Sequence, residues 1–106
     1  MAKSKEEIIN EAKNIVAKIE AFIEKFGGCY PDWYVGITGN KEQRLFVDHN
    51  VNRKGYWICC EAYSSDIARI IEDYFIEEHE TQGGSGGGND DSVYVYAYKV
   101  TSDTIE

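Results

Sequence analysis

The sequence predicts a small α/β domain of the α+β kind, with the order α-β-α-β-α-β and a mainly antiparallel three-stranded sheet flanked by three helices. Three observations lead to this fold class. Three segments carry apolar side chains at helical spacing. Aromatic and β-branched runs, bounded by Gly, Ser, Asn or Pro, lie between and after them. The length of 106 residues with 42% hydrophobic residues indicates one domain, residues 1–106, that buries its own core.

The first helix is expected over residues 5–26, where Lys and Glu fill the face opposite the apolar stripe. Ser4 followed by Glu7 has the form of a capping box, and Gly27-Gly28 provides the backbone freedom that ends a helix. A stripe of this kind is nearly always packed on a sheet, so we assign it no chemistry. Its members are Ile8, Ala12, Ile15, Ile19, Phe22, Ile23 and Phe26.

The central part of the chain predicts two strands and two helices. After a turn at Pro31-Asp32, residues 33–38 read as a strand that ends at Gly39-Asn40. Asn40 and Gln43 form a second possible capping box, which predicts a short helix ending near residue 50. Residues 56–62 are expected to form the second strand, and residues 64–66 open the next helix. Its expected core side is Ile67, Ile70, Ile71, Tyr74 and Phe75.

The last strand is expected within residues 92–100. It alternates Val and Ala on one side with Tyr94, Tyr96 and Tyr98 on the other, so both faces are largely apolar. Such a strand is more often inside a sheet than at its edge. The glycine-rich loop 82–91 precedes it and suits either an engineered linker or a natural loop around an active site. We expect residues 83–88 to be the most mobile internal segment.

Charge and cysteine content exclude several classes of function. The net charge of −8 repels nucleic acid and anionic membranes, so a phosphate ligand must meet a local basic patch. No run approaches the roughly 20 apolar residues of a membrane span, which predicts a cytoplasmic protein without a membrane partner. Cys59 and Cys60 point to opposite strand faces and Cys29 lacks a C-x-x-C partner, so we expect three small buried hydrophobes rather than disulfides or zinc.

The residues that suggest chemistry begin on the first strand. Tyr34-Val35-Gly36 is followed by Arg44, ten residues after the tyrosine, which brings both side chains near one strand-to-helix corner. Further on, Ala68 precedes Glu72 by four residues on a helix. This combination, over roughly residues 33–76, resembles the second half of the GIY-YIG nuclease family, in which a YIG-like strand leads into a helix with an essential arginine. A later helix of that family carries the metal-binding glutamate.

The resemblance implies a metal-dependent endonuclease that hydrolyses phosphodiester bonds. Glu72 would hold Mg²⁺ or another divalent cation, because a hard cation that keeps several waters needs few protein ligands. Arg44 would stabilise charge on the phosphoryl oxygens, and Tyr34 would orient the attacking water. With Arg44, three further cations would meet the nucleic acid backbone, namely Lys41, Arg53 and Lys54.

Two features depart from the family pattern. The strand that normally opens the family with its GIY motif is missing from its usual place, where the long first helix lies. The C-terminal strand could fill the vacant sheet position and supply the first tyrosine, for which Tyr96 is preferred over Tyr94 and Tyr98. The family's histidine commonly lies four residues beyond the arginine, whereas His49 lies five beyond Arg44, which rotates it by about 100° on an α-helix.

Two classes of function therefore remain open. The first is an endonuclease acting on DNA or RNA. The second is a catalytically inactive GIY-YIG-like scaffold that acts as an acidic protein-binding module. In the second class Tyr34 is a packed strand aromatic, Arg44 a solvated helix residue and Glu72 one of many acidic surface groups. Convergence of these three residues with His49 and one late tyrosine on a single cleft would favour the enzyme.

Overall fold

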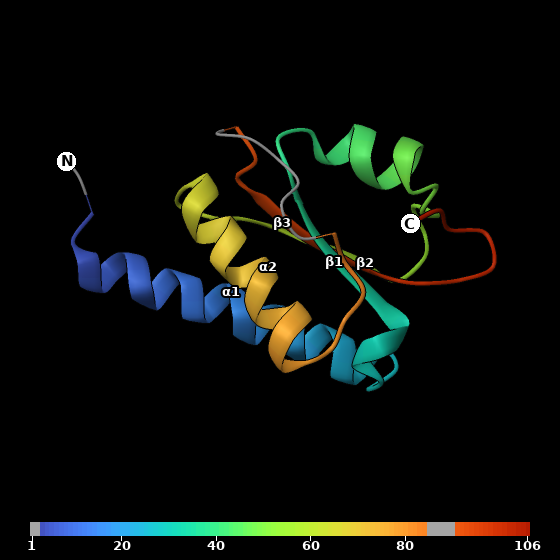
Figure 1. The fold of residues 1–106 in the computed structure, drawn as a ribbon, viewed down its shortest axis with the longest axis horizontal. Coiled ribbons are helices and arrows are strands. Elements are labelled where there is room, and N and C mark those ends of the chain that lie inside the picture. Colours follow the sequence, from blue (N-terminus) through green and yellow to red (C-terminus); the bar gives the residue numbers. More distant parts are fainter. Residues whose placement is uncertain (1–2, 85–90) are drawn as a thin grey trace.

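The computed structural model describes residues 3–84 and 91–106. Three strands form one antiparallel sheet in the order β1-β3-β2, which confirms the expected α/β fold class. Figure 1 shows the two long helices, α1 and α2, on one side of the sheet and the short helix η2 on the other. The elements are α1 (Lys5–Lys25), η1 (Tyr30–Asp32), β1 (Trp33–Thr38), η2 (Gln43–Asp48), β2 (Trp57–Glu61), α2 (Ser65–Glu78) and β3 (Tyr94–Lys99).

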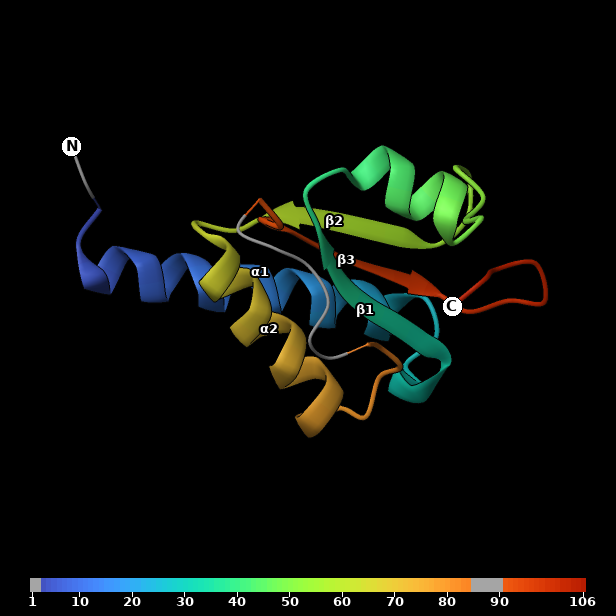
Figure 2. The ribbon, with the colours of Figure 1, turned by 45° about the horizontal axis from the view of Figure 1, so that its top comes forward.

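The C-terminal strand β3 is the central strand of the sheet, as its apolar alternation predicted. Figure 2 shows it between its two antiparallel neighbours, β1 and β2. Val95 and Ala97 lie in the core beneath α1 and α2, whereas Tyr96 and Tyr98 lie in a second core on the η2 side. The C-terminal strand therefore lies directly beside the strand that carries Tyr34.

Helix α1 begins and ends where its local signals predicted, to within one residue. The Ser4 hydroxyl accepts the Glu7 N–H at 3.1 Å, and the Glu7 carboxylate accepts the Ser4 N–H at 3.4 Å. At the other end, Gly28 has a φ of 79° and its N–H donates to the Ile23 carbonyl at 2.8 Å. A left-handed residue of this kind favours glycine, so the Gly27-Gly28 pair does end the helix.

Helix α2 confirms its predicted cap but not its entire predicted core face. The Ser64 hydroxyl accepts the Ile67 N–H at 3.3 Å. Ile71 and Phe75 are buried, whereas Ile70 is 62% exposed and Tyr74 37% exposed, so their assignment to the core side was wrong. The apolar arc of this helix is wider than the surface that the sheet covers, and its outer edge faces solvent.

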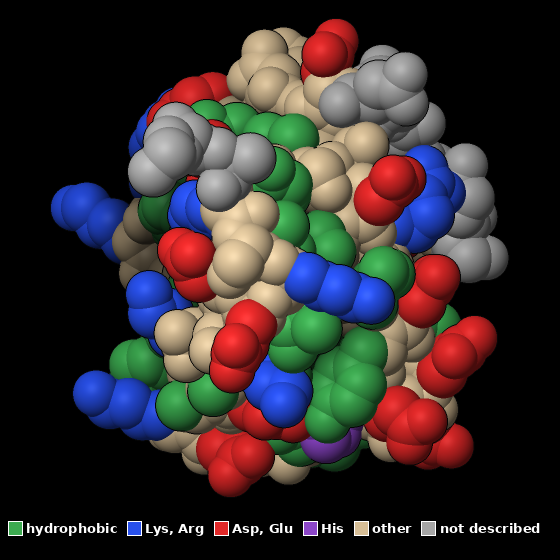
Figure 3. Space-filling view, turned by 90° about the vertical axis from the view of Figure 1, so that its left-hand side faces the viewer, with side chains coloured by type: hydrophobic (Ala, Val, Ile, Leu, Met, Phe, Trp, Pro, Cys, Tyr) green, Lys and Arg blue, Asp and Glu red, His purple; other side chains and the backbone are tan. Residues whose placement is uncertain are grey.

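The outer edge of this arc lines a groove between the two long helices. Ile70 and Tyr74 of α2 share it with Ile9 and Val16 of α1. Figure 3 faces the end of the molecule where α1 begins and shows hydrophobic side chains lying among acidic and basic ones. Within residues 3–84 and 91–106, neither helix has the length and apolarity that crossing a bilayer demands.

Helix η2 differs from the short α-helix that was expected. It starts as predicted, since the Asn40 side-chain oxygen accepts the Gln43 N–H at 3.1 Å. It then widens into a π-helix, in which the His49 N–H donates to the Arg44 carbonyl, five residues back, at 2.9 Å. A π-helix closes its hydrogen bonds over five residues, whereas an α-helix closes them over four. The five-residue spacing therefore places His49 about one turn after Arg44.

The structure confirms the predicted positions of two cysteines but not that of the third. Cys60 packs on the α1–α2 side of the sheet and Cys59 on the η2 side, as strand alternation predicted. Burial raises the pKa of Cys59 to about 11. Cys29 was expected to be buried but is exposed in the connection before η1. Residues 85–88 of the segment expected to be mobile lie outside the described residues.

Candidate active site

The aromatic cluster on the η2 side of the sheet contains three of the four side chains expected to be catalytic, namely Tyr34, His49 and Tyr96. Tyr34 comes from β1, Tyr96 and Tyr98 from the neighbouring β3, and His49 from the end of η2. The ring centroid of Tyr34 lies 4.7 Å from that of His49, 5.3 Å from that of Tyr98 and 6.3 Å from that of Tyr96. We call these four residues the tyrosine–histidine cluster.

Gly36 makes room for the central tyrosine of this cluster. It lies opposite Tyr96 in the sheet register. A Cβ atom at this position would lie 2.6 Å from Cζ of the Tyr96 ring, which is closer than real Cβ contacts allow. The glycine of the Tyr34-Val35-Gly36 motif thus has a steric role, because Tyr96 lies across the strand where a side chain would otherwise project.

His49 is 5% exposed and both of its ring nitrogens have partners. Nε2 lies 2.8 Å from the Tyr96 hydroxyl, while Nδ1 lies 2.6 Å from the Ile105 carbonyl and 3.0 Å from the Tyr98 hydroxyl. A carbonyl oxygen can only accept, so Nδ1 carries the proton. Burial, with a contribution from Arg44, lowers the pKa of His49 and favours the neutral ring. Nε2 therefore accepts the hydrogen bond from Tyr96.

Glu72 of α2 is buried, with 2% of its surface exposed, so the interpretation of it as an acidic surface group was wrong. Among the described residues, its Oε1 atom has no hydrogen-bond partner. Burial raises the pKa of the carboxyl group to about 7, and Asp73 raises it further while Arg69 opposes the shift. A buried carboxylate oxygen without a partner is costly unless a ligand or cation completes it.

Electrostatic coupling connects Glu72 and Arg44 to the cluster. Burial raises the pKa of Tyr34, Glu72 raises it further, and the Arg44 guanidinium lowers it. For Tyr96, burial is again the largest cause of a raised pKa, with Glu72 raising and Arg44 lowering it as well. Both charges therefore act through space on the same two phenols, although α2, which carries Glu72, and the tyrosines pack on opposite faces of the sheet.

Arg44 is partly exposed and is not locked into the fold. Its Nη1 atom lies 3.5 Å from Asp48, and both side chains are more than two fifths exposed, at 43% and 42%. An exposed i,i+4 pair of this type contributes only about 0.3–0.5 kcal/mol to stability. The guanidinium can therefore exchange this carboxylate for a phosphate at little cost.

The other expected phosphate-binding residues lie around η2. Arg53 forms an ion pair with Glu42 at 2.7 Å and lies over the ring of Phe46, with its guanidinium carbon 4.1 Å from the ring centroid. Lys41 lies over the ring of Tyr94, with its Nζ atom 5.2 Å from the ring centroid. Lys54 is exposed in the turn before β2. Residues 40–56 hold four basic side chains against two acidic ones, so this segment is locally basic in an acidic chain.

The carboxylate of Glu72 suits Mg²⁺ better than zinc as a bound metal. Within the described ranges, no three His, Cys, Asp or Glu side chains come together as a metal cluster. Zinc, which prefers four nitrogen and sulfur ligands, is therefore a poor fit to Glu72. Mg²⁺ keeps several waters and is commonly held by one or two carboxylates plus substrate phosphates, which matches a single buried carboxylate with an unpartnered oxygen.

Two members of the site were not singled out from the sequence. Tyr98 was one of three alternatives, although it shares the β3 face of Tyr96 and so could have been paired with it. The carbonyl of Ile105 carries no sequence signal, since it contacts His49 across 56 residues of chain.

Comparison of the chain with protein-family models, with curated proteins and with solved structures found no match in any of the three.

Proposed function

We propose that this protein is a divalent-metal-dependent endonuclease that hydrolyses phosphodiester bonds in DNA or RNA, with a site similar to that of the GIY-YIG family. One observation carries the proposal. The buried carboxyl group of Glu72, with an oxygen that has no partner among the described residues, lies within electrostatic reach of two phenols that Arg44 also influences. A carboxylate can hold a divalent cation and an arginine can stabilise charge on the phosphoryl oxygens, which are two functions that serve phosphodiester hydrolysis.

The hydrogen bond between Tyr96 and His49 provides a path for the proton of the attacking water. Tyr96 donates its hydroxyl hydrogen to Nε2 of His49 at 2.8 Å. As the water attacks phosphorus, its proton passes to the Tyr96 oxygen while the Tyr96 proton passes to Nε2. The phenol is neutral before and after the step, and the charge appears on the imidazolium. The raised pKa of Tyr96 is compatible with this role, because the phenol need not ionise beforehand.

Tyr34 and Arg44 act on the substrate in this proposal. The Tyr34 hydroxyl orients the water. Arg44 offers a planar fork of donors to the phosphoryl oxygens. Glu72 would hold the divalent cation, which would supply positive charge to stabilise the transition state.

The position of β3 supports a permuted arrangement. The family's opening strand should lie beside the strand that bears Tyr34, and β3 pairs with it along six residues. Gly36 faces Tyr96 across this pair. A tyrosine from the end of the chain would thereby take the place of one from its beginning, while His49 reaches the same group through the π-helical turn of η2.

The test is a cleavage assay on single- and double-stranded DNA and RNA, with Mg²⁺ and with a chelator. We expect magnesium-dependent cleavage by the parent and a loss of at least about 100-fold in Glu72→Gln, the equivalent of about 2.7 kcal/mol in the barrier. Glu77→Gln is the matched control, since Glu77 is an exposed carboxylate on the same helix. Equal cleavage by Glu72→Gln and the parent would refute the proposal. A parent that cuts none of the four substrates would favour the acidic protein-binding module instead.

A further inference from the structure

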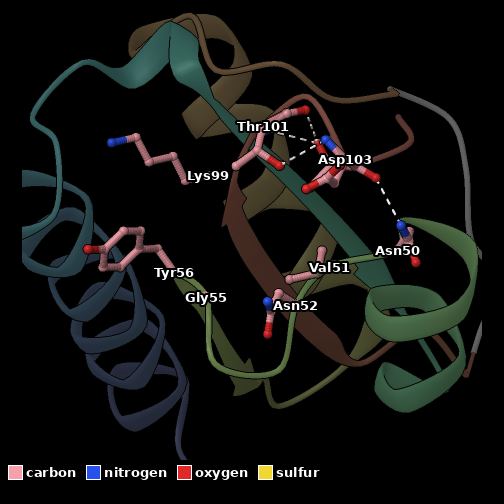
Figure 4. A pocket seen from close by; sticks show the side chains of 9 residues that line it. Asn50, Val51, Asn52, Gly55, Tyr56, Lys99, Thr101 and Asp103 are labelled. Carbon is pink, nitrogen blue, oxygen red and sulfur yellow. Dashed lines mark hydrogen bonds between the residues drawn. The ribbon is translucent and has the colours of Figure 1, made fainter.

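The segment after β3 folds back onto the end of η2. Figure 4 shows Asn50 pointing toward Asp103, and the Asn50 amide donates to the Asp103 carbonyl at 3.0 Å. A tight turn shapes this segment, because the Thr101 N–H donates to the Thr104 hydroxyl at 3.0 Å. At the next residue, the Ile105 N–H donates to the carbonyl of His49 at 2.8 Å. We call residues 101–105 the return segment.

Ile105 therefore holds His49 twice. Its N–H binds the backbone carbonyl of His49, and its own carbonyl accepts from Nδ1 of the imidazole at 2.6 Å. The backbone bond sets the position of His49, and the Ile105 carbonyl, which can only accept, favours the proton on Nδ1, where the Tyr98 hydroxyl at 3.0 Å is a second neighbour. With the proton on Nδ1, the lone pair of Nε2 faces the Tyr96 hydroxyl. The side chain of Ile105 is 59% exposed, so the contact depends on the backbone rather than on packing.

We infer that the return segment is a positioning device that keeps His49 in its Nδ1–H tautomer, ready to take the proton of Tyr96. Ile105 is a positioning residue in this scheme, since it acts on the substrate only through His49. Its catalytic consequence rests on the proposed endonuclease function, whereas the tautomer itself does not. Backbone carbonyls commonly fix the tautomer of functional histidines in this way, by accepting from the nitrogen that is not in use.

The test uses the full chain labelled with ¹⁵N and reads the imidazole shifts of His49 by NMR without substrate. In the parent we expect a protonated Nδ1 and an unprotonated Nε2. Ile105→Pro removes the N–H that donates to His49 and should shift the ring toward the Nε2–H tautomer. Ile105→Val keeps that N–H and is the matched control, with an unchanged tautomer. His79→Gln provides the assignment, because the chain has only two histidines.

Asn50→Gly serves as a second, milder variant if Ile105→Pro does not fold, because the φ of 54° at Asn50 suits glycine but would strain alanine. It removes the side-chain bond to the Asp103 carbonyl and should give a partial shift in the same direction. The inference is overturned if the parent carries the proton on Nε2, or if a folded Ile105→Pro keeps it on Nδ1.

The catalytic consequence is read separately in the cleavage assay. With an active parent, Ile105→Pro should lower kcat more than it raises KM and should alter the pH profile of kcat, whereas Ile105→Val should match the parent. An unchanged kcat and pH profile in a variant with the altered tautomer would remove the positioning role. A parent with the expected tautomer but no cleavage would count against the endonuclease function alone.

Discussion

The buried carboxyl group of Glu72 predicts a stability effect with an unusual dependence on pH. In the folded protein burial raises its pKa to about 7, above the unperturbed value of 4.5. The folded state therefore binds more protons than the unfolded state between these two values. Stability from this group is fully present below about pH 4.5 and is lost as the pH rises through about 7. Most carboxylates act in the opposite direction, since pairing usually lowers their pKa.

The size of the effect follows from the two pKa values. The interval from 4.5 to about 7, converted at about 1.36 kcal/mol for each pH unit, gives an upper bound of about 3 kcal/mol. Movement of the ionised side chain toward water reduces the cost, so we expect Glu72→Gln to stabilise the protein by about 1–3 kcal/mol at pH 8. At pH 4 the amide and the protonated acid are similar, and the difference should be close to zero.

Urea unfolding of the parent and of Glu72→Gln at pH 4, 6 and 8 measures this difference directly. Subtracting the two curves cancels the contributions of the other carboxylates, and Glu77→Gln controls for the loss of one surface charge. At pH 8, saturating MgCl₂ should raise the melting temperature of the parent more than that of Glu72→Gln. A difference between Glu72→Gln and the parent that does not change from pH 4 to pH 8 would refute the burial argument.

Three further predictions concern the sheet, the site and the first helix. Gly36→Ala should lose about 1–3 kcal/mol in urea unfolding, because its Cβ would overlap the Tyr96 ring, and an unchanged midpoint would contradict that contact. Arg44→Ala should cut cleavage by at least about tenfold while stability stays within about 0.5 kcal/mol, and ready unfolding would instead make the residue structural. Ser4→Ala should lose about 0.5–2 kcal/mol in thermal unfolding through its bond with Glu7, and no change would mean the cap is dispensable.

Local signals in the sequence were enough to predict the helices and strands. The capping box at Ser4, the glycines after α1 and the side-chain oxygen of Asn40 each act within three or four residues of chain. The alternation along β3 is equally local, and it predicted both a central strand and a shared face for Tyr96 and Tyr98. Such patterns are readable because their physical cause lies between near neighbours.

The composition of the site depended on contacts that no short segment contains. Glu72 resembles the exposed acids around it in sequence, and only the tertiary structure buries it. Conversely, Ile70 has the spacing of a core residue but faces solvent, because the sheet covers a narrower arc than the helix offers. Burial is set by the surfaces that meet, which the apolar period of one helix does not specify.

The sequence by itself determined the element order, the caps and the two apolar faces of the last strand, since each follows from spacing within one segment. Only the tertiary structure decided how these parts combine around His49. The π-helical turn of η2 offsets the extra residue after Arg44, and the carbonyl of Ile105 orients the ring from 56 residues away. Closing so long a loop depends on many weak contacts acting together, and no local pattern records their outcome.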